Sequence, residues 1–207
     1  LDLYLGYSLL ALSDLEIHGL RVWRATADGN LMKAREEVSQ LVGRDVERLD
    51  LAGCNRATLE SLSENLSDGV VSPLIWLTLV GIPGMLAFKV ISTMDSMVGY
   101  RNSRYLRFGW FGARADDLMN WVPARLTWVL LSISAWVLPG YDGRMAWSIG
   151  LSQHQYMSGP NAGWGQATSA GALRVQLVGE KWKNGRLQHN AWLGHSDDPA
   201  QVGADSI

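Results

Sequence analysis

GVVSPLIWLTLVGIPGMLAF, residues 69–88, contains no charged side chain and lies between two polar blocks, residues 43–69 and 89–127. Its 20 residues match the length of about 20 that a helix needs to cross a bilayer. Two prolines and two glycines interrupt the stretch: Pro73, Gly81, Pro83 and Gly84. Because such breaks leave backbone groups unpaired in lipid, a helical hairpin, a re-entrant pair or a segment buried in a bundle competes with one straight span.

The composition is apolar for a chain of 207 residues, since 47% of the residues are hydrophobic, 18% are charged and 10 are tryptophan. It is unusual for a soluble domain, although hydropathy alone does not prove a membrane location. The formal net charge of −2 argues against a dedicated nucleic-acid binder, which normally has a basic excess. The single cysteine, Cys54, is predicted to be reduced and buried rather than catalytic.

We interpret the chain as a single all-α domain and as a fragment of a longer protein. Its predicted segments are the end of a membrane helix (1–20), a polar helical block (21–68), a broken apolar hairpin (69–88), a polar motif block (89–125), a membrane helix (126–141) and a glycine-rich polar segment (142–207).

Three carboxylates in the first block have a helical spacing. Glu60, Glu64 and Asp68 are four residues apart, so a helix would place them on one face. Like charges in such a row repel each other unless a cation joins them. A magnesium ion with a bound phosphate would satisfy the triplet, and a solvated helix face is the alternative.

The second block also combines acidic and basic residues. Asp116, Asp117 and Asn120 lie between Arg114 and Arg125. Arginine suits phosphate and carboxylate ligands, so this stretch is a candidate for binding an anionic substrate. An interfacial helix with its charges at lipid headgroups explains the same pattern.

Further candidates follow the apolar stretch. Lys89, Asp95 and the arginines of YRNSRY, residues 100–105, are either phosphate ligands or anchors on the cytoplasmic side of a membrane. GPNAG, residues 159–163, could present backbone N–H groups to an anion.

Several strings together resemble the adenosylcobinamide-phosphate synthase family (CobD/CbiB) of cobalamin biosynthesis. The similarity runs from about Leu12 to Gly194 and is carried by these strings: LVGRDVERLD, ATLESLSENLSDGVVSPLIW, KVISTMDSMVGYRNSRYLRFGW, ARADDLMNWVPARLT, and GPNAGW followed by AGAL.

This resemblance implies a polytopic integral membrane helical bundle with broken or re-entrant helices, located in the bacterial inner membrane. It implies an ATP-dependent ligase that joins an aminoalcohol phosphate, either aminopropanol phosphate or ethanolamine phosphate, to a carboxylate of adenosylcobyric acid. Magnesium and ATP are the implied cofactors, and the corrinoid is a substrate. The expected partners are these substrates, membrane lipid and either a second copy or other cobalamin-pathway membrane enzymes, but no nucleic acid.

The resemblance also suggests roles for individual residues. The catalytic candidates are Glu60, Glu64, Asn65, Asp68, Asp116 and Asp117. The substrate-binding candidates are Lys89, Asp95, Arg101, Asn102, Arg104, Arg114, Asn120, Arg125 and Asn161. The metal candidates are Glu64, Asp68 and Asp117.

Two departures from the family pattern lie near the last motif. Gly159 replaces the usual serine, and Gln166 replaces a glutamate, so a possible negative ligand is lost. Retention of the acidic motifs favours the ligase, whereas Gln166 favours a non-catalytic relative of the AmpE-like inner-membrane sensor type. A small-molecule transporter with broken helices is a third alternative.

The motifs and the hydropathy together predict a topology. If residues 69–88 crossed a membrane once, the two polar blocks would lie on opposite sides and could not share one site. We therefore predict a broken hairpin that returns the chain to the same side.

Overall fold

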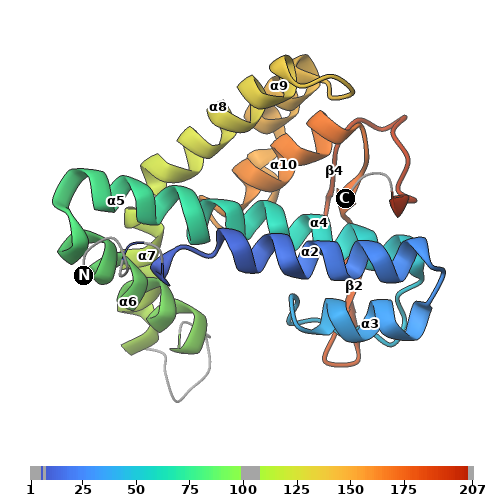
Figure 1. Ribbon diagram of the computed structural model, residues 1–207, viewed down its shortest axis with the longest axis horizontal. Helices are drawn as coiled ribbons and strands as arrows, with labels where there is room; N and C mark the ends of the chain where they lie inside the picture. The colour runs from blue at the N-terminus through green and yellow to red at the C-terminus, as the bar shows by residue number, and fades with distance from the viewer. Residues whose placement is uncertain (1–5, 7, 99–107, 205–207) are drawn as a thin grey trace.

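The computed structural model describes residues 6, 8–98 and 108–204, and it is largely helical (Figure 1). This confirms the all-α prediction in its main part. The helices are α2 (Leu12–Ala27), α3 (Leu31–Ser39), α4 (Leu51–Leu66), α5 (Ser72–Val80), α6 (Ile82–Val98), α7 (Phe108–Met119), α8 (Trp121–Val137), α9 (Gly143–Gln153) and α10 (Ala162–Leu173). Two short helical segments are η1 (Ser67–Val71) and η2 (His154–Tyr156).

Helix α4 lies between two hydrophobic cores, with α2 and α3 on one side and α9 and α10 on the other (Figure 1). In the first core, Val22 and Ala34 pack near Cys54, which is fully buried, as the sequence predicted. Burial raises the pKa of this thiol to about 11, so it stays protonated near neutral pH. In the second core, Leu59 packs with Ala167 and the C-terminal segment.

Residues 51–80 form one uninterrupted helical rod whose middle is a π-helical turn, η1. The Asp50 side chain begins the rod by accepting a hydrogen bond from the Gly53 N–H at 2.7 Å. The π-helical turn immediately precedes Pro73, whose ring would clash with the carbonyl of residue 69 in a regular α-helix. The wider turn therefore lets the helix continue past the proline.

The apolar stretch does break, at Gly81. This residue has φ +76°, a conformation that glycine adopts readily, and it separates α5 from α6. The two helices then pack against each other. A Cβ atom at Gly84 would lie 2.8 Å from the Trp76 carbonyl oxygen, so the close approach needs glycine at this position. Residues 69–88 thus form a helical hairpin rather than one straight span.

In the part of the chain that the structure describes, no helix has both the length and the apolar character needed to cross a membrane. Helix α8, over the membrane helix predicted at 126–141, runs from Trp121 to Val137 and includes Arg125. Helix α2 continues across the boundary predicted at residue 20. Large apolar side chains are exposed on α5 to α8, among them Leu79, Val90, Leu118 and Val137. The membrane location stays a prediction.

The C-terminal segment departs from the all-α prediction because it contains two small antiparallel sheets. Strand β1 (Leu177–Val178) pairs with β4 (Trp192–Leu193), and β2 (Lys181–Lys183) pairs with β3 (Arg186–Gln188). Strands of two or three residues are too short to show an alternating pattern. The signal that the sequence did carry is Asn184-Gly185, whose positive φ angles of 53° and 71° form the tight turn between β2 and β3.

The close contact between α10 and α4 gives a test of the packing. A Cβ atom at Gly165 would lie 2.4 Å from the Ser63 carbonyl oxygen, which is backbone and cannot rotate away. We expect Gly165→Ala to lower the free energy of unfolding by about 1–3 kcal/mol, measured by chemical denaturation. Gly159→Ala is the matched control, because nothing lies within 4 Å of its added Cβ. Equal stability of the two variants would contradict this packing.

Candidate functional site

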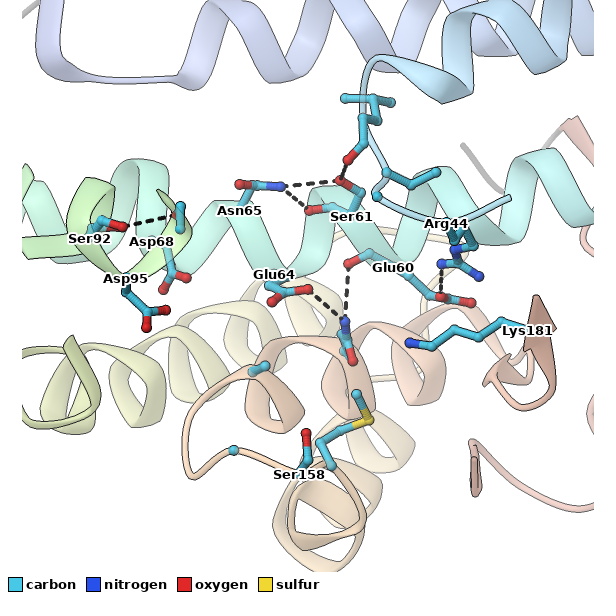
Figure 2. Close-up of a pocket in the computed structure, with 18 of the residues that line it drawn as sticks. Arg44, Glu60, Ser61, Glu64, Asn65, Asp68, Ser92, Asp95, Ser158 and Lys181 are labelled. Carbon is cyan, nitrogen blue, oxygen red and sulfur yellow. Dashed lines mark hydrogen bonds and ion pairs between the residues drawn. The ribbon is translucent and has the colours of Figure 1, made fainter. Parts of the chain in front are cut away.

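A pocket of about 660 Å³ opens between the two polar blocks and the C-terminal segment. Figure 2 shows residues of α4 and η1 along one wall, with α6 at one end and β2 at the other. The polar residues that line it are Arg44, Glu60, Ser61, Glu64, Asn65, Asp68, Ser92, Asp95, Ser96, Asp116, Ser158, Gln166, Lys181 and Lys183. The structure thus brings both predicted blocks to one site, because the α5–α6 hairpin turns the chain back.

The three carboxylates spaced by four all line this pocket, as their helical spacing predicted. Glu60 and Glu64 belong to α4, whereas Asp68 lies in the π-helical turn. Such turns occur often at functional sites because they alter the direction of the side chains that follow.

The Glu60 carboxylate already has three partners within the protein. It pairs with Arg44, lies 3.8 Å from the Arg56 guanidinium and accepts the Val178 N–H at 2.9 Å. With only 3% of its surface exposed, this carboxylate holds the wall of the pocket together.

Glu64 has fewer partners and opens into the pocket. Gln166 donates a hydrogen bond from Nε2 to its carboxylate at 3.2 Å. The Glu64 side chain is exposed to the pocket, yet the protein atoms close to it desolvate the carboxylate and raise its pKa, and the nearby Lys181 opposes that shift. Glu64 is therefore a carboxylate that gains from a cationic ligand.

A cluster of three aspartates occupies the end of the pocket near α6 and α7. Burial, reinforced by Asp116, Glu64 and Asp95, raises the pKa of Asp68 to about 8. Burial raises the pKa of Asp116 to about 6, although a hydrogen bond from the Asn120 amide at 3.0 Å opposes the shift. The pKa of Asp95 is also raised, by burial and by Asp117.

Two acceptor atoms in this acidic half of the pocket lack a donor within the described residues. They are Oδ1 of Asp116 and Oε1 of Gln166, both inaccessible to solvent. Gln166 as a whole is 4% exposed. Buried acceptors without partners are costly. An ammonium bound in the pocket would favour the ionised forms of the nearby carboxylates, but it could reach these two buried oxygens only after their side chains moved.

The opposite end of the pocket is basic, with Arg44 from the loop before α4 and Lys181 and Lys183 from β2. Sequence reasoning assigned no role to these three residues. Lys181 and Glu64 are 117 positions apart (181 − 64), and no local pattern links such positions.

A family model described as CobD/Cbib protein matches residues 1–206. The chain belongs to this family.

Curated relatives agree with this membership. A protein of Yersinia enterocolitica serotype O:8 named cobalamin biosynthesis protein CobD is 41% identical over 206 residues, covering 100% of this chain and 64% of its own length. Proteins of the same name from Photorhabdus laumondii and Geobacter metallireducens are 42% and 46% identical, over 93% and 84% of this chain. The chain covers 60% of the Photorhabdus protein and 55% of the Geobacter protein. It therefore spans about three fifths of the length of these relatives. No solved structure matches the chain.

Several candidates from the CobD/CbiB motifs lie beside the pocket rather than in its wall. Asp117 pairs with Arg114 at 3.0 Å, and the Asn161 amide donates to the Asp117 carbonyl at 2.8 Å. Asn120 is buried between Asp116 and the hydroxyl of Ser72.

The remaining candidates have other surroundings. Arg125 stacks on Trp121, with its guanidinium carbon 3.9 Å from the ring centre. Lys89 is half-buried and lowers the pKa of Asp68. Asn65 lines the pocket and donates to the Ser61 carbonyl at 2.9 Å. Arg101, Asn102 and Arg104 lie outside the described residues.

The implied magnesium ion needs several oxygen ligands close together. Among residues 6, 8–98 and 108–204, no three acidic, histidine or cysteine side chains are grouped so that they could hold one ion. Asp117 in particular is turned toward Arg114. A magnesium site at Glu64, Asp68 and Asp117 stays a prediction.

The raised pKa of Asp68 predicts how stability changes with pH. The folded state keeps this proton up to about pH 8, whereas the unfolded chain releases it near pH 4. The folded state therefore binds more protons in this window, and the contribution of Asp68 lowers the free energy of unfolding as the pH rises through it. We expect Asp68→Asn to be more stable than the wild type at about pH 8 by at least about 1 kcal/mol, the equivalent of one pKa unit.

Denaturation curves at several pH values would measure this difference, which should shrink toward about pH 5, where the wild-type residue is protonated as well. A difference that does not change with pH would show that Asp68 does not titrate in this way.

Proposed function

We propose that this protein acts in cobalamin biosynthesis and joins an aminoalcohol phosphate, aminopropanol phosphate or ethanolamine phosphate, to a carboxylate of adenosylcobyric acid. One observation supports this most directly: the pocket is acidic at one end and basic at the other. An aminoalcohol phosphate is itself positive at its amine and negative at its phosphate. The names of the curated relatives support the pathway.

The volume of the pocket is consistent with the proposed substrates. Small-molecule sites usually have volumes of about 300–1,000 Å³. A pocket of about 660 Å³ suits the aminoalcohol phosphate and the carboxylate arm to which it is joined. The corrin ring would remain outside the pocket, with only the reacting arm inserted.

The chemistry requires that the amine lose a proton before it attacks. A bound ammonium near Asp68 favours the carboxylate over the neutral acid, so the Asp68 proton is released to water when the substrate enters. The Asp68 carboxylate then accepts a proton from the ammonium nitrogen. Burial raises the pKa of Asp68 before the substrate binds, and this brings the carboxylate closer to the pKa of an amine than an exposed aspartate would be. Glu64, whose carboxylate accepts a hydrogen bond from Gln166 Nε2, orients the nitrogen.

The neutral amine nitrogen forms a bond to the carbonyl carbon of the activated carboxylate. The bond from that carbon to its leaving oxygen breaks, the leaving group departs as an oxyanion, and the second nitrogen proton passes to water. The family resemblance implies that ATP, with magnesium, supplies the activation of the carboxylate when bound. The residues of this pocket bind, orient and deprotonate the amine.

The direct test is incubation of the purified protein with adenosylcobyric acid, ATP, magnesium and each aminoalcohol phosphate. Mass spectrometry should detect an amide product whose mass is that of the two substrates less one water. A folded protein that gives no amide with any amine would contradict the ligase and favour a non-catalytic, AmpE-like relative.

Asp68→Asn tests the proposed base. Loss of a positioned base costs about 10²–10⁴-fold in rate, so we expect kcat for amide formation to fall within this range. The same variant is expected to be no less stable than the wild type, so lost activity cannot be attributed to unfolding. Glu36→Gln, which changes an exposed carboxylate of α3, is the control and should keep its activity. Wild-type kcat in Asp68→Asn would assign the base elsewhere.

A further inference from the structure

The hairpin of β2 and β3 carries the lysines at the basic end of the pocket. Lys181 and Lys183 are two residues apart on β2, so they project from the same face of the strand. Figure 2 shows the Lys181 side chain extending from β2 into the pocket, on the side away from Asp68 and Asp95. The hairpin therefore faces the carboxylates across the pocket.

The hairpin is fixed to the loop before α4 by several interactions of Asp45 and Arg48. The two carboxylate oxygens of Asp45 accept the N–H groups of Asn184 and Gly185, at 3.0 and 2.7 Å. The Asp45 N–H donates to the Trp182 carbonyl at 3.1 Å. The Arg48 guanidinium carbon lies 3.7 Å from the centre of the Trp182 ring. Lys181 and Lys183 flank Trp182 in the sequence, so these contacts set the position of both lysines.

The basic side chains at or near this end of the pocket differ in the ion pairs that they already form. Arg44 pairs with Glu60, and Arg56 lies close to the same carboxylate. By contrast, neither Lys181 nor Lys183 forms an ion pair among the described residues. Burial and the nearby Arg44 lower the pKa of Lys181, and Glu60 and Glu64 offset this effect only in part. An anion bound between these side chains would offset the remainder.

We propose that Lys181, assisted by Lys183, binds the phosphate group of the aminoalcohol phosphate and thereby directs the amine toward Glu64 and Asp68. This inference rests on the proposed ligase function and adds the orientation of the substrate and two residues that hold it. Lysine suits this task because its ammonium is a compact charge that can donate to more than one phosphate oxygen. The phosphate of ATP is the other anion with the same chemistry, so the experiment must separate the two sources.

The kinetic test compares Lys181→Gln with the wild type on phosphorylated and unphosphorylated aminoalcohols. A hydrogen bond to a charged group contributes about 1.5–3 kcal/mol, which corresponds to a factor of about 10–100. We expect KM for ethanolamine phosphate to rise by about that factor, while kcat/KM for ethanolamine and KM for ATP stay unchanged. Lys33→Gln, an exposed lysine of α3, is the control with no expected effect.

An increase in KM for ATP would assign Lys181 to the nucleotide, and an equal loss with both amines, or no loss, would overturn the proposal. Asp45→Asn gives a second test, because it weakens the attachment that positions the hairpin without changing either lysine itself. We expect a smaller increase in KM for ethanolamine phosphate, again with no change for ethanolamine.

A binding measurement separates this inference from the proposed function. Calorimetry of ethanolamine phosphate with the wild type, without ATP or corrinoid, should show binding that Lys181→Gln weakens about 10–100-fold. If no amide is ever formed but this binding depends on Lys181, the phosphate site stands and the ligase fails. If amide is formed and binding is the same in both proteins, the ligase stands and the phosphate site fails.

Discussion

The buried carboxylate of Glu60 is the constraint on which the pocket depends. It joins Arg44 in the loop before α4, Arg56 within α4 and the Val178 N–H of β1. Removing one partner of a buried ion pair costs about 3–5 kcal/mol, because a charge is left uncompensated. The loop from 41 to 45 and the strand segment after α10 are therefore held against one helix. This connection holds Arg44 at the pocket, and together with the Asp45 and Arg48 contacts of the hairpin it also places Lys181 there.

The second constraint is the path of the chain between the polar blocks. The π-helical turn lets the rod pass Pro73, and Gly81 then ends α5 so that α6 can pack back along it. The π-helical turn accommodates proline, which lacks a backbone N–H donor and clashes in a regular α-helix. The end of α5 depends on glycine, which adopts positive φ readily. The result is that Asp95 and Asp116 approach Asp68, although about 30 to 50 residues separate them in sequence.

Local patterns predicted the parts of this structure that depend on local rules. The spacing of Glu60, Glu64 and Asp68 correctly placed them on one wall, because a helix repeats every 3.6 residues. Adjacent positions were harder to separate. Asp116 lines the pocket, whereas Asp117 pairs with Arg114, and neighbours on a helix point about 100° apart in directions that only tertiary packing decides. Lys181 was missed because its strand has three residues and its neighbours in space come from distant segments.

The distribution of charge explains how one small pocket could both bind and activate a zwitterion. Without a cation, burial and then the repulsion between carboxylates favour protonated groups at the acidic end, as the raised pKa values of Asp68 and Asp116 indicate. At the other end, burial disfavours the charge of Lys181. A ligand with an ammonium at one end and a phosphate at the other would relieve both costs together, whereas the reversed ligand would increase both. Orientation in such a pocket follows from electrostatics, and the carboxylates that attract the ammonium are also those able to take its proton.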